Sequence, residues 1–175
     1  MKVTLGLYLL TFITLNSCFN KNIQKPVNQH ELQLKESLAK KDFDLDKEII
    51  DEYISKNDSL KFMNNSNAFW WSVLTKNDTH KKIDTSVEIT YTYSVFNFKD
   101  QEIYSKDDIG TQYAVIGRTK QIRALTEVFK ELSEGEKAIL LVPSFSAYGF
   151  SGDGHKIGPA QPIIIKLEIV KLKQL

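Results

Sequence analysis

The segment VPSFSAYGFSGDGHKIGPAQP, residues 142–162, decides the fold that we expect for this chain. Its closely spaced glycines and prolines interrupt both helix and strand, which predicts one long loop. The stretches on either side predict β-strands, Lys137–Val142 before the loop and residues 163 onward after it. In the second strand apolar and polar residues alternate. The apolar positions are Ile163, Ile165, Leu167 and Ile169, and the polar ones are Lys166 and Glu168.

Farther upstream, the chain predicts more strands and one short helix. Residues 87–95 alternate between apolar and polar side chains and form the clearest strand, while residues 69–74 and 113–116 predict two others. Thr119 is suited to cap a helix over residues 119–132. The apolar face of that helix consists of Ile122, Leu125, Val128, Phe129 and Leu132. Antiparallel strands with one helix between them give an α+β fold class.

A second helix is expected before the sheet, over residues 31–57. Its apolar face carries Ile49, Ile50, Tyr53 and Ile54. Asp44 or Asp46 has the side chain to cap the start of the strongest part of this pattern, and Asn57 is a suitable stop. The helix therefore predicts an N-terminal extension over residues 31–66, ahead of a domain over residues 67–175.

Residues 87–173 resemble the FKBP family of peptidyl-prolyl cis-trans isomerases. The family pattern is a strand, a proline, a short turn ending in Ala-Tyr-Gly, a glycine-bearing loop, Ile-Pro-Pro and a final strand. This chain has Pro143, then Ala147-Tyr148-Gly149, then Ile157-Gly158-Pro159, in the same order and spacing. The resemblance implies an FKBP-like fold: a curved antiparallel β-sheet wrapped around the short helix, with a shallow apolar pocket between them.

The resemblance also implies where the site lies. The catalytic residues would be Tyr91, Ile122 through its backbone N–H, and Tyr148 through its hydroxyl. The substrate-binding residues would be Ile103, Tyr104, Leu125, Ile157 and Ile165. The family usually has Phe-Asp where this chain has Ile103-Tyr104, so the family's acid is unmatched, and a further pocket aromatic falls at Gln112. Asp107 or Asp108 replaces that acid if its loop folds back, and a Tyr148 bonded to backbone within the core remains the alternative for that residue.

Isomerisation of this kind needs no nucleophile, metal or cofactor. Amide resonance sets the rotation barrier at roughly 18–20 kcal/mol, so a catalyst has only to bind the twisted bond better than the planar one. The expected partners are proline-containing polypeptides. Two functions stay open: an isomerase that assists folding or assembly of exported proteins, and a binding module of an envelope complex without useful turnover. If the implied pocket is right, Tyr148→Ala or Leu125→Asp lowers activity without unfolding the domain.

The N-terminus predicts export. Lys2 precedes an apolar run over residues 3–15, which is too short to span a bilayer and fits a signal peptide. Leu15-Asn16-Ser17-Cys18 resembles a bacterial lipobox, which implies removal of residues 1–17, a lipid on Cys18 and a membrane anchor at the bacterial cell envelope, either on the periplasmic face or in the outer membrane. Residues 18–30 would then be a flexible tether. A secreted protein with a free thiol and an uncleaved membrane helix are the alternatives.

The remaining sequence features carry one further resemblance and exclude several kinds of site. The layout of the N-terminal helix followed by Phe69-Trp70-Trp71 resembles FKBP-like lipoproteins linked to gliding motility. The two tryptophans face opposite ways in a strand, so one is expected in the core and the other at the surface or at an interface. A net charge of +1 without a basic block indicates no nucleic-acid partner. Ser151-Gly152-Asp153-Gly154 predicts a flexible turn rather than a phosphate or calcium loop. The histidines have no metal-ligand spacing: His30, His80 and His155.

Overall fold

The computed structural model describes residues 28–65, 69–77 and 87–175. Several predicted features lie outside the described residues: the signal peptide over residues 1–17, the tether from Cys18 to residue 27, and His80. The helices and strands are α1 (Gln29–Lys56), β1 (Met63–Asn65), β2 (Phe69–Thr75), β3 (Val87–Phe96), β4 (Glu102–Tyr104), α2 (Lys106–Ile109), β5 (Gln112–Val115), α3 (Arg123–Val128), β6 (Lys137–Val142) and β7 (Ile163–Gln174), with 3-10 turns η1 (Ser144–Ser146) and η2 (Gly149–Ser151) in the long loop.

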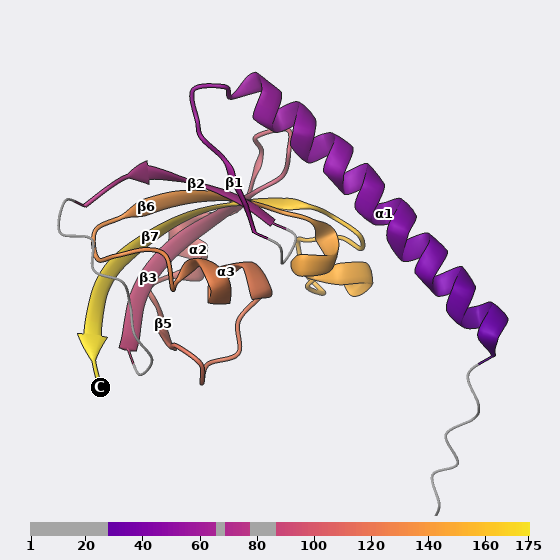
Figure 1. Ribbon diagram of the computed structural model, residues 1–175. Helices are drawn as coiled ribbons and strands as arrows, with labels where there is room; N and C mark the ends of the chain where they lie inside the picture. Colours follow the sequence, from indigo (N-terminus) through magenta and orange to yellow (C-terminus); the bar gives the residue numbers. More distant parts are fainter. Residues whose placement is uncertain (1–27, 66–68, 78–86) are drawn as a thin grey trace, which may run out of the picture.

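The strands of the described residues form one antiparallel sheet in the order β1-β2-β6-β7-β3-β4. Strand β3 pairs with β7 along its whole length, and its other edge is shared by β5 near the start and β4 near the end. The long strands curve together, and the short helix α3 lies within the curve (Figure 1). The expected curved sheet around one short helix is confirmed.

Apolar and polar residues alternate along β3 and β7, and the apolar ones form the core on the inner side of the curved sheet. In β7 the four predicted apolar residues are buried in one cluster, which they share with the apolar side of β3 and with α3. Ile164 faces the other way into a second cluster, while Lys166 is exposed. A shift in register between Thr90 and Tyr91 leaves Val170 of β7 without a partner. The period of two therefore predicted the core face of both strands correctly.

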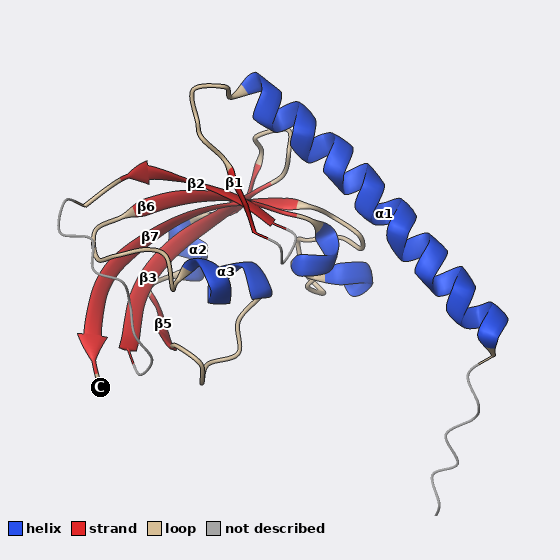
Figure 2. Cartoon of the chain, viewed as in Figure 1, coloured by secondary structure: helices blue, strands red, loops and turns tan. Residues whose placement is uncertain are grey.

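Helix α1 covers part of the outer side of the sheet. Figure 2 shows this helix in blue beside the red strands. Ile50 of α1, Trp70 of β2 and Ile164 of β7 are buried together there, and Trp71 is buried in the inner cluster. The two tryptophans face opposite ways, as expected. Trp71 lies in the core, and Trp70 lies at the contact between β2 and α1 rather than at the open surface. The reason is that α1 packs over the side of β2 that a lone sheet would leave open.

Both helix boundaries differ from those predicted. α1 begins at Gln29, where the Asn28 side chain accepts a hydrogen bond from the His30 N–H at 3.2 Å, so Asp44 and Asp46 lie inside the helix and cap nothing. α3 spans only residues 123–128. Thr119 does not cap it, because its hydroxyl accepts a hydrogen bond from the Val115 N–H at 2.8 Å and closes the preceding turn. The apolar face predicted for α3 is nevertheless the buried one.

The N-terminal segments also divide differently from the sequence expectation. Gln29 and His30, assigned to a tether, belong to α1, and Met63–Asn65, assigned to the helical extension, forms β1 at the edge of the sheet. The predicted stop at Asn57 is confirmed as the C-cap of α1. Among the helices of the described residues, none has the length and apolar character needed to cross a membrane.

Candidate functional site

The eight predicted site residues of the domain lie in one apolar cluster on the inner side of the sheet. They come from five separate parts of the chain. Tyr91 is on β3, Ile103 and Tyr104 are on β4, Ile122 and Leu125 are at the start of α3 and within it, Tyr148 and Ile157 are on the loop that follows β6, and Ile165 is on β7. The fold therefore brings together positions that are spread over 75 residues of sequence, from 91 to 165.

These residues lie at two depths. Tyr91, Leu125, Ile157 and Ile165 are at most 3% exposed and form the base. Ile103, Tyr104, Ile122 and Tyr148 are half-buried and form a rim that solvent reaches. Leu125, which the resemblance places on the floor of the pocket, is 1% exposed because α3 presents its side chain to the core. A peptide would meet the four rim residues first.

The tyrosine hydroxyls give the site its polar groups. Tyr148 makes no hydrogen bond with any described residue, so the alternative of a core tyrosine bonded to backbone is wrong for the described part of the chain. Burial, with smaller contributions from the neighbouring Tyr93 hydroxyl and Asp153 carboxylate, raises the pKa of Tyr148 to about 12. Burial likewise raises the pKa of Tyr91. The hydroxyl of Tyr148 is therefore protonated at neutral pH and available as a donor.

The backbone at the start of α3 supplies another donor. Ile122 is the N-cap of the helix, with φ −59° and ψ 145°, and its carbonyl accepts a hydrogen bond from the Thr126 N–H at 3.2 Å. The N–H of an N-cap residue takes no part in the hydrogen bonds within the helix. The N–H of Ile122 therefore has no partner within the helix, and its role as a donor to substrate stays a prediction from the resemblance.

A carboxylate that the sequence analysis missed lies at the same rim. The Tyr104 hydroxyl donates to Oδ2 of Asp153 at 2.5 Å, and Oδ1 of Asp153 accepts from the N–H groups of His155 at 2.8 Å and Ile157 at 2.9 Å. Burial raises the pKa of Asp153, but these three hydrogen bonds together outweigh it and lower the pKa below its usual value. An ionised acid therefore stands beside Tyr104, supplied by the loop rather than by β4.

The alternative acids proposed from the sequence do not take that place. Asp108 is the third residue of α2, where it forms a reciprocal cap with Ser105 and an ion pair with Lys156 at 3.3 Å. Lys156 also lies over the Tyr104 ring, 4.8 Å from its centroid. Gln112, which stands at a family aromatic position, donates from Nε2 to the Ile109 carbonyl at 2.8 Å. The carboxylate that the structure places beside Tyr104 is therefore that of Asp153.

The glycine-rich turn that carries Asp153 is tightly built. Gly152 has φ 66°, and a Cβ at that position would lie 2.2 Å from the Ile157 carbonyl oxygen. Only glycine fits so close an approach with that backbone conformation. The turn predicted over residues 151–154 is present, and the Asp153 carboxylate holds it against Ile157 through hydrogen bonds. An acid directly after Ser151-Gly152 and followed by Gly-His was the signal for such a side-chain-to-backbone turn.

His155 is exposed next to this turn. Among the residues that the structure describes, no three His, Cys, Asp or Glu side chains are grouped so that they could hold a metal ion.

Comparison with known proteins agrees with this arrangement. The model of the family described as FKBP-type peptidyl-prolyl cis-trans isomerase matches residues 77–170. The chain is 31% identical over 100 residues to FK506-binding protein 1B of Aspergillus fumigatus, an alignment that covers 54% of this chain and 83% of that protein.

Two solved structures share the fold at low sequence identity. A peptidyl-prolyl cis-trans isomerase of Pseudomonas syringae pv. tomato has a TM-score of 0.61 at 19% identity, covering 77% of this chain and 96% of that one. The N-terminal domain of FKBP42 of Arabidopsis thaliana has a TM-score of 0.57 at 14% identity, covering 65% and 93%. Since the family model spans more than half of the 175 residues, and since a relative above 30% identity is matched over most of its length, this chain belongs to the FKBP-type peptidyl-prolyl cis-trans isomerase family.

Proposed function

We propose that this protein isomerises Xaa-Pro bonds of exported polypeptides at the rim formed by Ile103, Tyr104, Ile122 and Tyr148, while a lipid on Cys18 holds it at the bacterial cell envelope. The observation that carries the first part is the free Tyr148 hydroxyl above an apolar base, beside the N-cap of α3. The lipid anchor is supported by the sequence around Cys18.

The chemistry asked of this rim is modest. The planar amide resists rotation because of its resonance, and the twisted bond has lost that resonance and part of its carbonyl charge. An apolar surface under the proline ring therefore favours the twisted form over the planar one. The Ile122 N–H and the Tyr148 O–H orient the peptide carbonyls, and the buried base keeps water from the ring. No covalent step takes place.

The direct test is isomerisation of a fluorescent Xaa-Pro peptide in an assay without protease. The enzyme is the mature chain carrying Cys18→Ser, which stays free of lipid. We expect the rate to rise in proportion to enzyme concentration. A correctly folded protein, judged by its circular dichroism, that leaves the uncatalysed rate unchanged would overturn the proposed activity.

A second candidate is a binding module that uses the same rim without useful turnover. The observation in its favour is the depth of the base, whose four residues are at most 3% exposed, so that a proline ring finds little open apolar floor. Binding of a proline peptide, followed by tryptophan or tyrosine fluorescence, separates the two candidates. Saturable binding without acceleration supports the module.

The lipid anchor makes its own prediction. When the full chain is expressed in a bacterium, we expect it in the membrane fraction and labelled by a fatty-acid analogue, and we expect Cys18→Ser to move it to the soluble fraction. Two or more acyl chains give stable anchoring, at about 0.8 kcal/mol for each buried CH₂ group. Asn20→Ala, which leaves the cysteine in place, is the matched control. Equal membrane partition of Cys18→Ser and wild type would contradict the anchor.

The resemblance to lipoproteins linked to gliding motility adds a narrower proposal about the clients. It rests on the order of the N-terminal helix and Phe69-Trp70-Trp71 in the sequence. On this proposal the clients are exported proteins of an envelope assembly that contain exposed Xaa-Pro bonds.

A further inference from the structure

One carboxylate of α1 is buried although the helix as a whole is polar. Asp46 is 3% exposed, and its Oδ2 accepts hydrogen bonds from the Ser144 N–H at 2.8 Å and from the Ser144 hydroxyl at 2.6 Å. Burial raises the pKa of Asp46, whereas the two bonds from Ser144 act against that shift. Burying a carboxylate is costly unless hydrogen bonds replace its water. A polar contact across 98 positions of sequence therefore joins α1 to the long loop.

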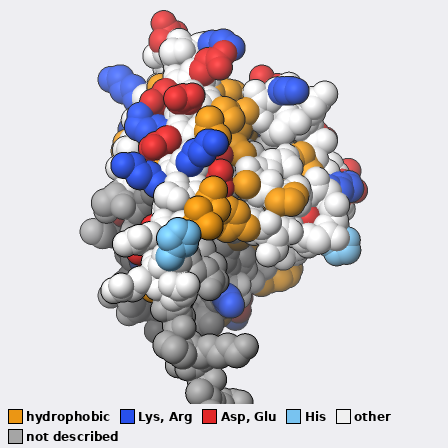
Figure 3. Space-filling view, turned by 90° about the vertical axis from the view of Figure 1, so that its right-hand side faces the viewer, with side chains coloured by type: hydrophobic (Ala, Val, Ile, Leu, Met, Phe, Trp, Pro, Cys, Tyr) orange, Lys and Arg blue, Asp and Glu red, His pale blue; other side chains and the backbone are white. Residues whose placement is uncertain are grey.

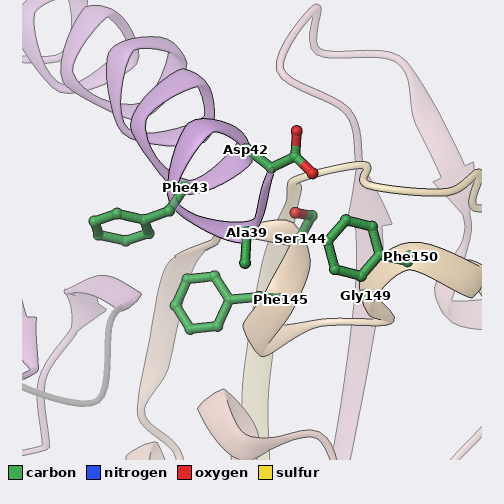
Figure 4. Close-up of a pocket in the computed structure, with 7 residues that line it drawn as sticks. All are labelled: Ala39, Asp42, Phe43, Ser144, Phe145, Gly149 and Phe150. Atoms are coloured by element: carbon green, nitrogen blue, oxygen red, sulfur yellow. The ribbon is translucent and has the colours of Figure 1, made fainter. Parts of the chain in front are cut away.

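Apolar contacts accompany this polar one. The rings of Phe43 and Phe145 meet edge to face with their centroids 5.5 Å apart. Beside them a cavity of about 30 Å³ separates α1 from the loop. Figure 4 shows its seven lining residues, three from α1 and four from the loop: Ala39, Asp42, Phe43, Ser144, Phe145, Gly149 and Phe150.

The outer surface of this junction is apolar as well. In Figure 3 hydrophobic side chains gather in a band near the centre of the face, next to charged side chains. Phe145 and Phe150 are among the exposed large hydrophobic residues of the chain. The contact between α1 and the loop thus has two parts: a buried polar part at Asp46 and an apolar part formed by aromatic side chains that reach the surface.

Ser144 is connected to the site by a short, bonded turn. It begins η1, and the N–H of Ala147 donates to the carbonyls of Pro143 and Ser144, each at 3.1 Å. Tyr148 follows Ala147 directly, and the Gly149 carbonyl accepts from the Ala160 N–H at 2.9 Å. A shift of Ser144 is therefore passed to Tyr148 within four residues, because the turn between them has its own hydrogen bonds.

We propose that Asp46 is a positioning residue for the isomerase site: by holding Ser144, it sets where the loop places the Tyr148 hydroxyl. This inference rests on the proposed function of the rim. Asp46 does not touch the peptide and acts only through the turn from Ser144 to Tyr148. Helix α1 is consequently part of the working domain as well as its connection to the N-terminal segment.

The test compares four variants in the isomerisation assay. Asp46→Ala removes both hydrogen bonds to Ser144, and Asp46→Asn keeps an oxygen that can accept them. Ser144→Ala removes only the hydroxyl bond, and Asp44→Ala removes an exposed carboxylate from the same helix. A small misplacement of a catalytic group costs up to about a hundredfold, and we expect Asp46→Ala to lower kcat/KM by about tenfold. We expect Asp46→Asn to recover most of that loss, Ser144→Ala to lose about threefold, and Asp44→Ala to match wild type.

Two readouts separate positioning from a general effect on stability. In a Tyr148→Ala background, Asp46→Ala should add almost nothing, because its effect passes through the missing hydroxyl. In NMR spectra, the amide signals of Tyr148 and Gly149 should shift in Asp46→Ala and stay in place in Asp44→Ala. If Asp46→Ala does not fold, Ser144→Ala carries both measurements.

The outcomes also separate this inference from the proposed function. An inactive wild type overturns the proposed function, and the amide shifts then decide whether Asp46 places the loop. An active wild type with a folded Asp46→Ala of unchanged kcat/KM overturns the inference alone. Full additivity of Asp46→Ala and Tyr148→Ala overturns it too, since it would show that Asp46 does not act through Tyr148.

Discussion

Tyr148→Ala is expected to lower kcat/KM for Xaa-Pro peptides by about 30-fold, which corresponds to about 2 kcal/mol of transition-state stabilisation. The change removes a hydroxyl that no described residue engages and an aromatic ring packed against the inner cluster. A hydrogen bond contributes about 1 kcal/mol net, and the lost apolar contact of the ring adds a similar amount. Because Tyr148 is half-buried and lies on a loop, the fold should persist.

Two controls divide this effect. Tyr148→Phe keeps the ring and removes only the hydroxyl, so about a fivefold loss is expected from one hydrogen bond. Tyr113→Ala removes a tyrosine that is 64% exposed on β5 and should leave activity unchanged. Circular dichroism and the melting temperature report whether each variant is folded. A folded Tyr148→Ala with wild-type kcat/KM would place the site elsewhere on the domain.

Leu125→Asp, in contrast, is no longer a suitable test of the site. From the sequence alone it was expected to act like Tyr148→Ala, on a folded domain. Leu125 is 1% exposed and packs in the inner core. A carboxylate at this position would be buried away from water, with no hydrogen-bond or ion-pair partner to replace its hydration. Unfolding is the expected outcome, because burying an unpaired charge costs several kcal/mol. Tyr148 and Leu125 differ in how deeply they are buried. The burial of Leu125 depends on how α3 packs against the sheet, which the sequence motif does not show.

The spacing of apolar residues along the chain predicted which face of a strand or helix is buried. A period of two in residues 87–95 identified the buried face of β3, since side chains of a strand alternate between its sides. The apolar spacing at Leu125, Val128 and Phe129 identified the buried face of α3. Both of these depend on local geometry alone. The loop with Pro143, Ala147-Tyr148-Gly149 and Ile157 was instead implied by the resemblance to the FKBP family.

The features that were missed depend on contacts between distant parts of the chain. Asp46 has the side chain of a helix cap, but its partner is Ser144, which no local pattern indicates. Trp70 is buried only because α1 lies over that side of the sheet. Asp153 sits in a segment with turn composition, and its bond to Tyr104 spans 49 positions. The resemblance implied that the acid of the family is unmatched at Tyr104, and the structure places the Asp153 carboxylate beside that residue.

Trp70→Ala is expected to lower the free energy of unfolding by about 4 kcal/mol, as large-to-small changes at buried aromatic positions do. Trp70 is 7% exposed and fills the space between β2 and α1 with Ile50, Leu141 and Ile164. Since small domains are stable by only about 5–15 kcal/mol, urea unfolding followed by circular dichroism should show a large shift of the midpoint.

The matched control for this change is Leu74→Ala, on the same strand but 46% exposed, where a loss below about 1 kcal/mol is expected. The pair of variants tests whether α1 belongs to the folded domain. If α1 only linked the domain to its N-terminal segment, Trp70 would face water as Leu74 does, and the two variants would cost the same. A large loss at Trp70 alone means that the helix which carries Asp46 is packed against the sheet, and only a packed helix can hold the loop at Ser144.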